Sequence, residues 1–189
     1  MATPLELLWA LIGLLLTIGG TFVEASIASP SWNFGSEALH TQSLGVNYQI
    51  GAVLLVGCLG GKKAGALSQI AYLALGLAWL PVFTKGGGLQ YLWEPTFGYL
   101  LGFVPGAWVC GWLAFKVAPR LEFLATSCLV GLLSIHVSGL IYLALIYSFN
   151  QEQVMTAAAK YSLSPLPGQL AIACAVSVLA FILRQVMFY

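Results

Sequence analysis

Long apolar runs dominate the chain, and shorter segments rich in polar and aromatic residues separate them. The runs lack strict alternation of apolar and polar residues, so we do not expect strands. Each run has room for the roughly 20 helical residues that cross a bilayer. The pattern therefore predicts an all-α integral membrane protein, a single domain over residues 1–189 with transmembrane helices at about 5–23, 44–61, 64–83, 97–115, 122–149 and 166–187.

Composition agrees with this prediction. The chain is 60% hydrophobic and 7% charged, whereas about 25% of the residues in soluble proteins are charged. The formal net charge of +1 gives no reason to expect a nucleic-acid partner. Each of the four cysteines lies within an apolar run, so we expect small buried side chains rather than disulfides or metal ligands. No cofactor is expected.

The first apolar run, 5–23, also has features of a secretory signal peptide, because small residues such as Ser26 and Ala28 follow it in the manner of a cleavage site. The basic segment that opens a signal peptide is missing, since residues 1–16 contain no Lys or Arg. We therefore interpret this run as a membrane helix.

The basic residues predict the orientation of the helices. Lys85 and Lys160 fall on one side of the predicted bundle. The other side has the remaining five, namely Lys62, Lys63, Lys116, Arg120 and Arg184. The positive-inside rule then places both termini in the cytoplasm, in a protein of the plasma membrane. The connections on the outer side, 24–43, 84–96 and 150–165, are long and polar, and long loops on one face often carry function.

Residues 80–103 interrupt the apolar pattern on this outer side. They contain consecutive glycines at 86–88, aromatic residues at Tyr91 and Trp93, and a helix start near Thr96. Irregular backbone beside a membrane is tolerated where it is buried in protein or lines a wet cavity. We therefore expect a ligand pocket here.

Three of the predicted helices begin on the outer side, near Gln49, Thr96 and Gln169. The free N–H groups and partial positive charge of a helix N-terminus favour an anionic group. Together these ends predict a cup for a small molecule with a carboxylate and an apolar body.

Several activities lack the residues that they need. The run at 57–65 (GCLGGKKAG) does not have the spacing of a phosphate-binding loop, and no HExxH or GxSxG motif is present. No predicted helix has a carboxylate or a lysine at its centre, although ion-coupled carriers use such groups. His136 is the one ionisable residue at depth, and we interpret it as a neutral histidine hydrogen-bonded between helices rather than a proton relay. An enzyme or a self-powered transporter is not expected.

Four segments carry a family resemblance: 49–68 (QIGAVLLVGCLGGKKAGALS), 80–88 (LPVFTKGGG), 94–103 (EPTFGYLLGF) and 166–169 (LPGQ). Their order resembles the BioY family, the biotin-specific substrate-binding (S) components of energy-coupling-factor (ECF) transporters. The resemblance implies six helices and biotin captured from the outside. It also implies partnership with a transmembrane coupling subunit and cytoplasmic ATPases.

The resemblance also suggests the ligand-binding residues, which are Gln49, Lys85, Trp93, Thr96, Tyr99 and Gln169. The family's Asp and Lys in the sixth helix are replaced here by Gln169 and Ile172. The ligand carboxylate is then left to helix N-termini, to Thr96, or to a loop lysine such as Lys85 or Lys160. The segment 24–43 is a candidate lid.

Two other functions stay open at this point. A membrane interaction protein would use its loops to bind another protein and would have no affinity for small molecules. A stand-alone facilitator for another vitamin-like solute would transport it in vesicles without any ATPase.

Overall fold

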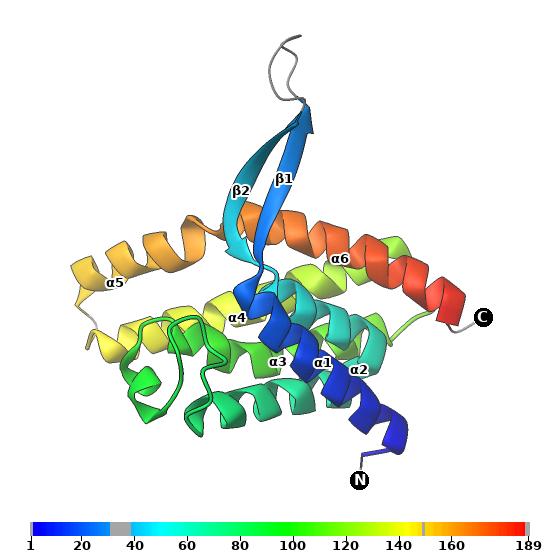
Figure 1. Ribbon diagram of the computed structural model, residues 1–189, viewed down its shortest axis with the longest axis horizontal. Coiled ribbons are helices and arrows are strands. Elements are labelled where there is room, and N and C mark those ends of the chain that lie inside the picture. Colours follow the sequence, from blue (N-terminus) through cyan, green and yellow to red (C-terminus); the bar gives the residue numbers. More distant parts are fainter. Residues whose placement is uncertain (1, 31–38, 149, 188–189) are drawn as a thin grey trace.

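The computed structural model describes residues 2–30, 39–148 and 150–187. In this part of the chain five helices are long and apolar enough to cross a membrane (Figure 1). They are α1 (Pro4–Phe22), α2 (Gln49–Leu77), α3 (Phe97–Ala114), α4 (Leu121–Ile146) and the stretch Gln151–Met187, which ends in α6 (Leu166–Met187). The helices near 64–83 and 122–149 thus end earlier than predicted, at Leu77 and Ile146.

The long helix α2 consists of two arms that fold back on each other at Gly61. This glycine has φ 77° and ψ −178°, a conformation outside the helix that is essentially restricted to glycine. Gln49 Nε2 donates to Tyr72 Oη at 2.8 Å across 23 positions of sequence, whereas a straight helix would separate these residues by about 35 Å. The arms, 49–60 and 62–77, therefore provide the second and third of the six predicted spans.

A β-hairpin joins α1 to α2 and projects from the helical bundle (Figure 1). Its antiparallel strands are β1 (Glu24–Pro30) and β2 (Leu39–Asn47). The prediction of no strands is therefore wrong, as is the predicted helix start at residue 44, because residues 44–47 belong to β2. Only the base of the hairpin packs on the bundle, through Ala25 and Val46, and the part that projects has no face that must be wholly apolar. Its sequence therefore lacks the alternation of a half-buried strand. Residues 31–38, which include Trp32, lie outside the described residues.

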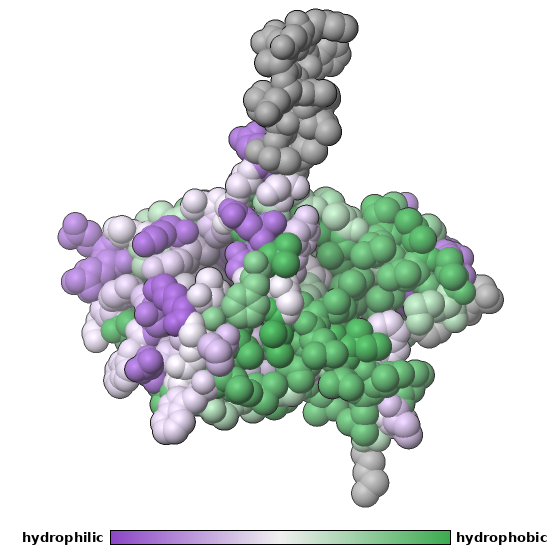
Figure 2. All heavy atoms as spheres, viewed as in Figure 1, coloured by the Kyte–Doolittle hydropathy of each residue, from purple (hydrophilic) through white to green (hydrophobic). Residues whose placement is uncertain are grey.

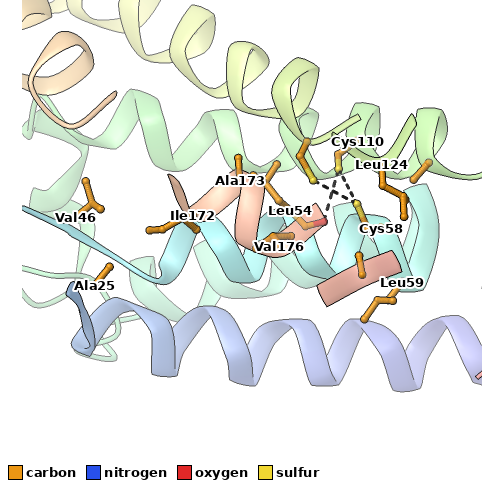
Figure 3. Close-up of a cluster of buried hydrophobic side chains, with 13 residues drawn as sticks. Ala25, Val46, Leu54, Cys58, Leu59, Cys110, Leu124, Ile172, Ala173 and Val176 are labelled. Carbon is orange, nitrogen blue, oxygen red and sulfur yellow. Dashed lines mark hydrogen bonds between the residues drawn. The ribbon is translucent and has the colours of Figure 1, made fainter. Parts of the chain in front are cut away.

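The bundle packs tightly where small residues let backbones approach each other. A Cβ added at Gly57 would lie 2.9 Å from Ala107 O, and one added at Gly65 would lie 3.1 Å from the same atom. Both arms of α2 therefore lie directly against α3. A cluster of buried apolar side chains fills the space between these helices, α4 and α6 (Figure 3).

The two ends of the bundle differ in polarity. Hydrophobic residues cover the helices on the face in Figure 2, and hydrophilic residues gather near α5 (Gln151–Ala158). Both described termini lie at the opposite end, where Lys63 Nζ is 3.5 Å from Glu6 Oε1 and Arg184 Nη1 donates to Ala114 O at 2.7 Å. That this end faces the cytoplasm stays a prediction.

The outer connections are more structured than expected for loops. Residues 150–165 form α5 and a π-helical segment, η2 (Ala159–Leu163), which leads into α6. Within 84–96, a short 3₁₀ helix, η1 (Leu89–Trp93), precedes α3. These elements surround the polar end of the bundle and supply part of the site.

Candidate functional site

A cavity of about 320 Å³ lies at the polar end, between the starts of α2, α3 and α6. Its volume is at the lower end of the roughly 300–1,000 Å³ that is usual for small-molecule sites. Five of the six residues predicted for the site line it: Gln49, Lys85, Thr96, Tyr99 and Gln169. These residues are up to 120 positions apart, so the helical topology alone brings them together.

Thr96 contributes an available hydroxyl group at the start of α3. It is the residue that precedes this helix, yet its side chain does not cap the helix. Its Oγ1 atom is buried and has no hydrogen-bond partner among the described residues. A buried hydroxyl without a partner costs free energy, which is offset when a ligand in the cavity bonds to it.

Gln169 of α6 belongs to a series of hydrogen bonds that connects four elements. His136 Nε2 of α4 lies 2.7 Å from Gln169 Oε1, and His136 Nδ1 lies 3.1 Å from Ser162 Oγ in η2. Ser162 Oγ in turn lies 2.6 Å from the Tyr99 hydroxyl of α3. These bonds match the interpretation of His136 as a histidine hydrogen-bonded between helices.

The chemistry of these groups determines which atom donates and which accepts in each of these hydrogen bonds. An amide oxygen only accepts, so His136 Nε2 donates to Gln169 Oε1. In a neutral imidazole Nδ1 then accepts from Ser162, which leaves Tyr99 to donate to Ser162 Oγ. The amide nitrogen of Gln169 has no partner within the described parts of the chain, and it is left to donate into the cavity.

Gln49 is oriented in the opposite sense. Its Nε2 donates to Tyr72 Oη at 2.8 Å, and Tyr72 donates to Val82 O at 2.9 Å. The carbonyl oxygen of Gln49 therefore remains as an acceptor at the cavity. The two glutamines thus offer one acceptor and one donor from helices α2 and α6.

The two lysines that line the cavity differ in their surroundings. Lys85 Nζ lies 2.7 Å from Glu94 Oε2, and this hydrogen bond raises the pKa of Lys85. Lys160 Nζ lies 5.3 Å from the centre of the Tyr161 ring. No carboxylate within the described ranges forms an ion pair with Lys160. The charge of Lys85 is balanced locally, and that of Lys160 is not.

Trp93 is not among the residues that line the cavity, and it is 82% exposed. Tyr91 lies there instead, 5% exposed, with its ring centre 4.6 Å from that of Phe83. The two residues belong to η1, where positions two apart point in different directions. The sequence shows two aromatic residues in this loop, and only the loop conformation selects between them.

Ile172 also lies away from this cavity, with 4% of its surface exposed. It borders a larger hollow of about 660 Å³ on the outside of α1, α2 and α6, together with residues such as Leu15 and Val176. That hollow is almost entirely apolar and has few groups to orient a ligand, so the smaller polar cavity is the better candidate. Ile172 is not among the residues that line the polar cavity.

Other lining residues were not among the predicted site residues. Asn47 comes from the end of β2, and Tyr161 comes from η2. Because we expected neither a strand at 39–47 nor a helical turn at 159–163, nothing in the sequence pattern pointed to these side chains.

Comparison with known proteins gives a consistent family match. The model of the BioY family matches residues 6–188. "Probable biotin transporter BioY" of Lysinibacillus sphaericus is 43% identical over 96 residues, which are 50% of this chain and 49% of that protein. "Biotin transporter BioY" of Thermotoga maritima is 44% identical over 79 residues, 41% of this chain and 47% of that one. The matched segments thus span about half the length of these bacterial relatives.

Two further proteins match over nearly the whole chain. An uncharacterised 21.2 kDa protein of Cyanophora paradoxa is 29% identical over 182 residues, which are 96% of this chain and 95% of that protein. The crystal structure of an S-component for biotin from an ECF-type ABC transporter covers 95% of this chain and 90% of its own, with a TM-score of 0.71 and 21% identity. At this identity the structural match shows a shared fold.

Proposed function

Because the chain belongs to the BioY family, we propose that this multi-pass membrane protein captures biotin from the outer face as the substrate-binding subunit of an ECF transporter. Its bacterial relatives are named as biotin transporters, and the crystal structure that shares its fold is that of an S-component for biotin. Both support biotin as the ligand. The observation that carries the proposal is the pair of oppositely oriented glutamines in one small cavity.

The ureido ring of biotin offers two N–H donors beside one carbonyl acceptor. Gln49 Oε1 is available to accept from an N–H group, and Gln169 Nε2 is available to donate to the carbonyl oxygen. Thr96 Oγ1 is a further partner, because a hydroxyl group both donates and accepts. A site built to pair with each of these groups discriminates strongly against ligands that lack them.

The apolar part of the ligand has partners in the same cavity. Ile50, Tyr91, Leu100 and Phe103 line it, and all but Ile50 are buried. The tetrahydrothiophene ring and the aliphatic chain of biotin would bury apolar surface against them, at about 25 cal/mol per Å² removed from water.

The carboxylate of the ligand is assigned to Lys160. Lys85 already pairs with Glu94, so its positive charge would attract a second carboxylate only weakly. Lys160 lines the cavity with its ammonium group free of such a pair within the described residues. The starts of α2, α3 and α6 add partial positive charge.

Transport would depend on partners that hydrolyse ATP. The chain has no phosphate-binding loop, so we assign that role to a coupling subunit and cytoplasmic ATPases at the plasma membrane. The end that holds Lys62, Lys63 and Lys116 is the one proposed to face them.

Equilibrium binding of labelled biotin to the purified protein tests the proposal. We expect saturable binding that thiamin and riboflavin do not displace. Gln169→Ala should weaken it by about 1–2 kcal/mol, roughly 5- to 30-fold, because a hydrogen bond to the ligand is lost and His136 Nε2 is left without its partner. Gln90→Ala, an exposed glutamine outside the cavity, is the matched control.

The two possible failures are distinct in this experiment. Absence of biotin binding to the folded wild-type protein would overturn the proposed ligand. Binding that Gln169→Ala and Gln49→Ala both leave unchanged would keep the ligand and exclude this cavity as its site. Cooperative thermal unfolding of each variant serves as the check that it is folded.

A further inference from the structure

Three of the four cysteines meet inside the apolar core, although they are 52 and 70 positions apart in sequence. Cys58 comes from α2, Cys110 from α3 and Cys128 from α4, and each has 0% of its surface exposed. Cys58 Sγ lies 3.6 Å from Cys110 Sγ and 3.6 Å from Cys128 Sγ (Figure 3). The fourth, Cys174, is exposed, so the expectation that all four are buried is wrong for it.

The spacing of the sulfur atoms suits a metal ion. All three Sγ atoms lie within 4.8 Å of one another. A metal bonded at about 2.3 Å to three sulfur atoms at the corners of a triangle requires them to be about 4 Å apart. The sulfur atoms are already close to this separation, so little movement is needed to enclose an ion.

The ligand set selects the kind of ion. The cluster has three soft sulfur ligands and no histidine or carboxylate among the described residues. Zinc would need a fourth ligand in this apolar surrounding, and hard ions such as Mg²⁺ need oxygen ligands. Cu(I) is a soft ion that thiolates select, and sulfur ligands alone complete its coordination.

The surroundings supply compensating charge. Cu(I) held by two thiolates and one thiol has a net charge of −1, and the two displaced protons pass to solvent. The buried Arg184 bonds to Ala114 O one turn along α3 from Cys110 and supplies positive charge nearby.

We propose that Cys58, Cys110 and Cys128 form a binding site for a soft monovalent cation of the Cu(I) class, which ties α2, α3 and α4 together. The site lies apart from the polar cavity and shares none of its lining residues. The proposal is therefore independent of the proposed transport function.

Anaerobic titration of the reduced, purified protein with Cu(I) against a coloured Cu(I) chelator tests this site. We expect the wild-type protein to withhold about one equivalent of copper from the chelator and to unfold at a higher temperature when loaded. Cys58→Ala should lose both effects, because Cys58 contacts both other sulfur atoms. Cys174→Ala should retain both and is the matched control.

Two results would overturn the proposal. One is a wild-type protein that withholds no more copper than folded Cys58→Ala. The other is a loss of copper in Cys174→Ala equal to that in Cys58→Ala, which would indicate adventitious binding to accessible thiols. Cys128→Ala is tested in the same way and should also lose copper retention. Loss in both variants separates removal of a ligand from a folding defect that is specific to position 58.

Discussion

At the scale of single residues, the site depends on which atom of each polar side chain is already bonded. Gln49 and Gln169 are chemically identical, yet Tyr72 occupies the amide nitrogen of one and His136 contacts the amide oxygen of the other. The cavity therefore receives an acceptor from α2 and a donor from α6. The partners Tyr72 and His136 determine which glutamine accepts and which donates at the cavity, and the glutamine residue type does not.

The two lysines give a residue-scale prediction. Lys160→Ala should reduce the preference for biotin over uncharged biotinamide by up to about 1 kcal/mol, roughly fivefold, since a partly exposed ion pair is lost. Competition binding with both ligands measures this preference. The preference in the wild type should also fall as salt is added.

Lys85→Ala is the matched control for this prediction. Its ammonium group is paired with Glu94, so the preference for biotin over biotinamide should change little. A larger loss of preference in Lys85→Ala than in Lys160→Ala would contradict the assignment of the carboxylate.

At the scale of elements, one glycine converts a single apolar stretch into two membrane spans. Gly61 has a backbone conformation that other residues adopt only with strain, and the arms of α2 pair from Gln49 to Tyr72 because of it. A Cβ added at Gly61 would come no closer than 3.6 Å to Phe115, so space there is not the constraint. The backbone angle is.

Gly61→Ala should therefore destabilise the protein by about 1–3 kcal/mol through backbone strain. Thermal or denaturant unfolding in detergent measures this. Gly19→Ala is the control, because Gly19 lies within α1 with open space around it, and alanine is about 1 kcal/mol better than glycine in a helix. A Gly61→Ala variant that is no less stable than Gly19→Ala would show that the turn at Gly61 tolerates a side chain.

At the scale of the whole molecule, the two ends of the bundle differ in polarity and charge. The polar end holds the cavity together with α5, η1 and the base of the hairpin. The other end holds both described termini and five of the seven basic residues. This separation suits a protein that takes a ligand from one side of a membrane and contacts partners on the other.

The positive-inside rule predicts which side is which. A protease-cleavable tag at the C-terminus should be protected in intact cells and cut when the membrane is opened. A tag inserted after Gln90, in the exposed part of the outer connection, should be cut in intact cells. The reverse pattern would place the cavity on the cytoplasmic side and would contradict uptake from outside.

The sequence by itself was enough to predict the membrane class, the approximate helices and the family. These follow from local properties, since an apolar run of sufficient length must form a helix in lipid. Gln49, Thr96 and Gln169, which line the cavity, could also be named from the sequence, because each lies near a predicted helix start. The hairpin was missed, because strands outside the bundle need no alternating pattern.

Only the tertiary structure decided how the side chains are used. It placed Tyr91 rather than Trp93 on the cavity, paired Lys85 with Glu94, and brought three distant cysteines together. Such contacts join residues from different helices and depend on rotation and crossing of whole elements. Local sequence periodicity does not report the rotation and crossing of helices, because it describes one helix at a time. Each of these contacts joins residues of different elements.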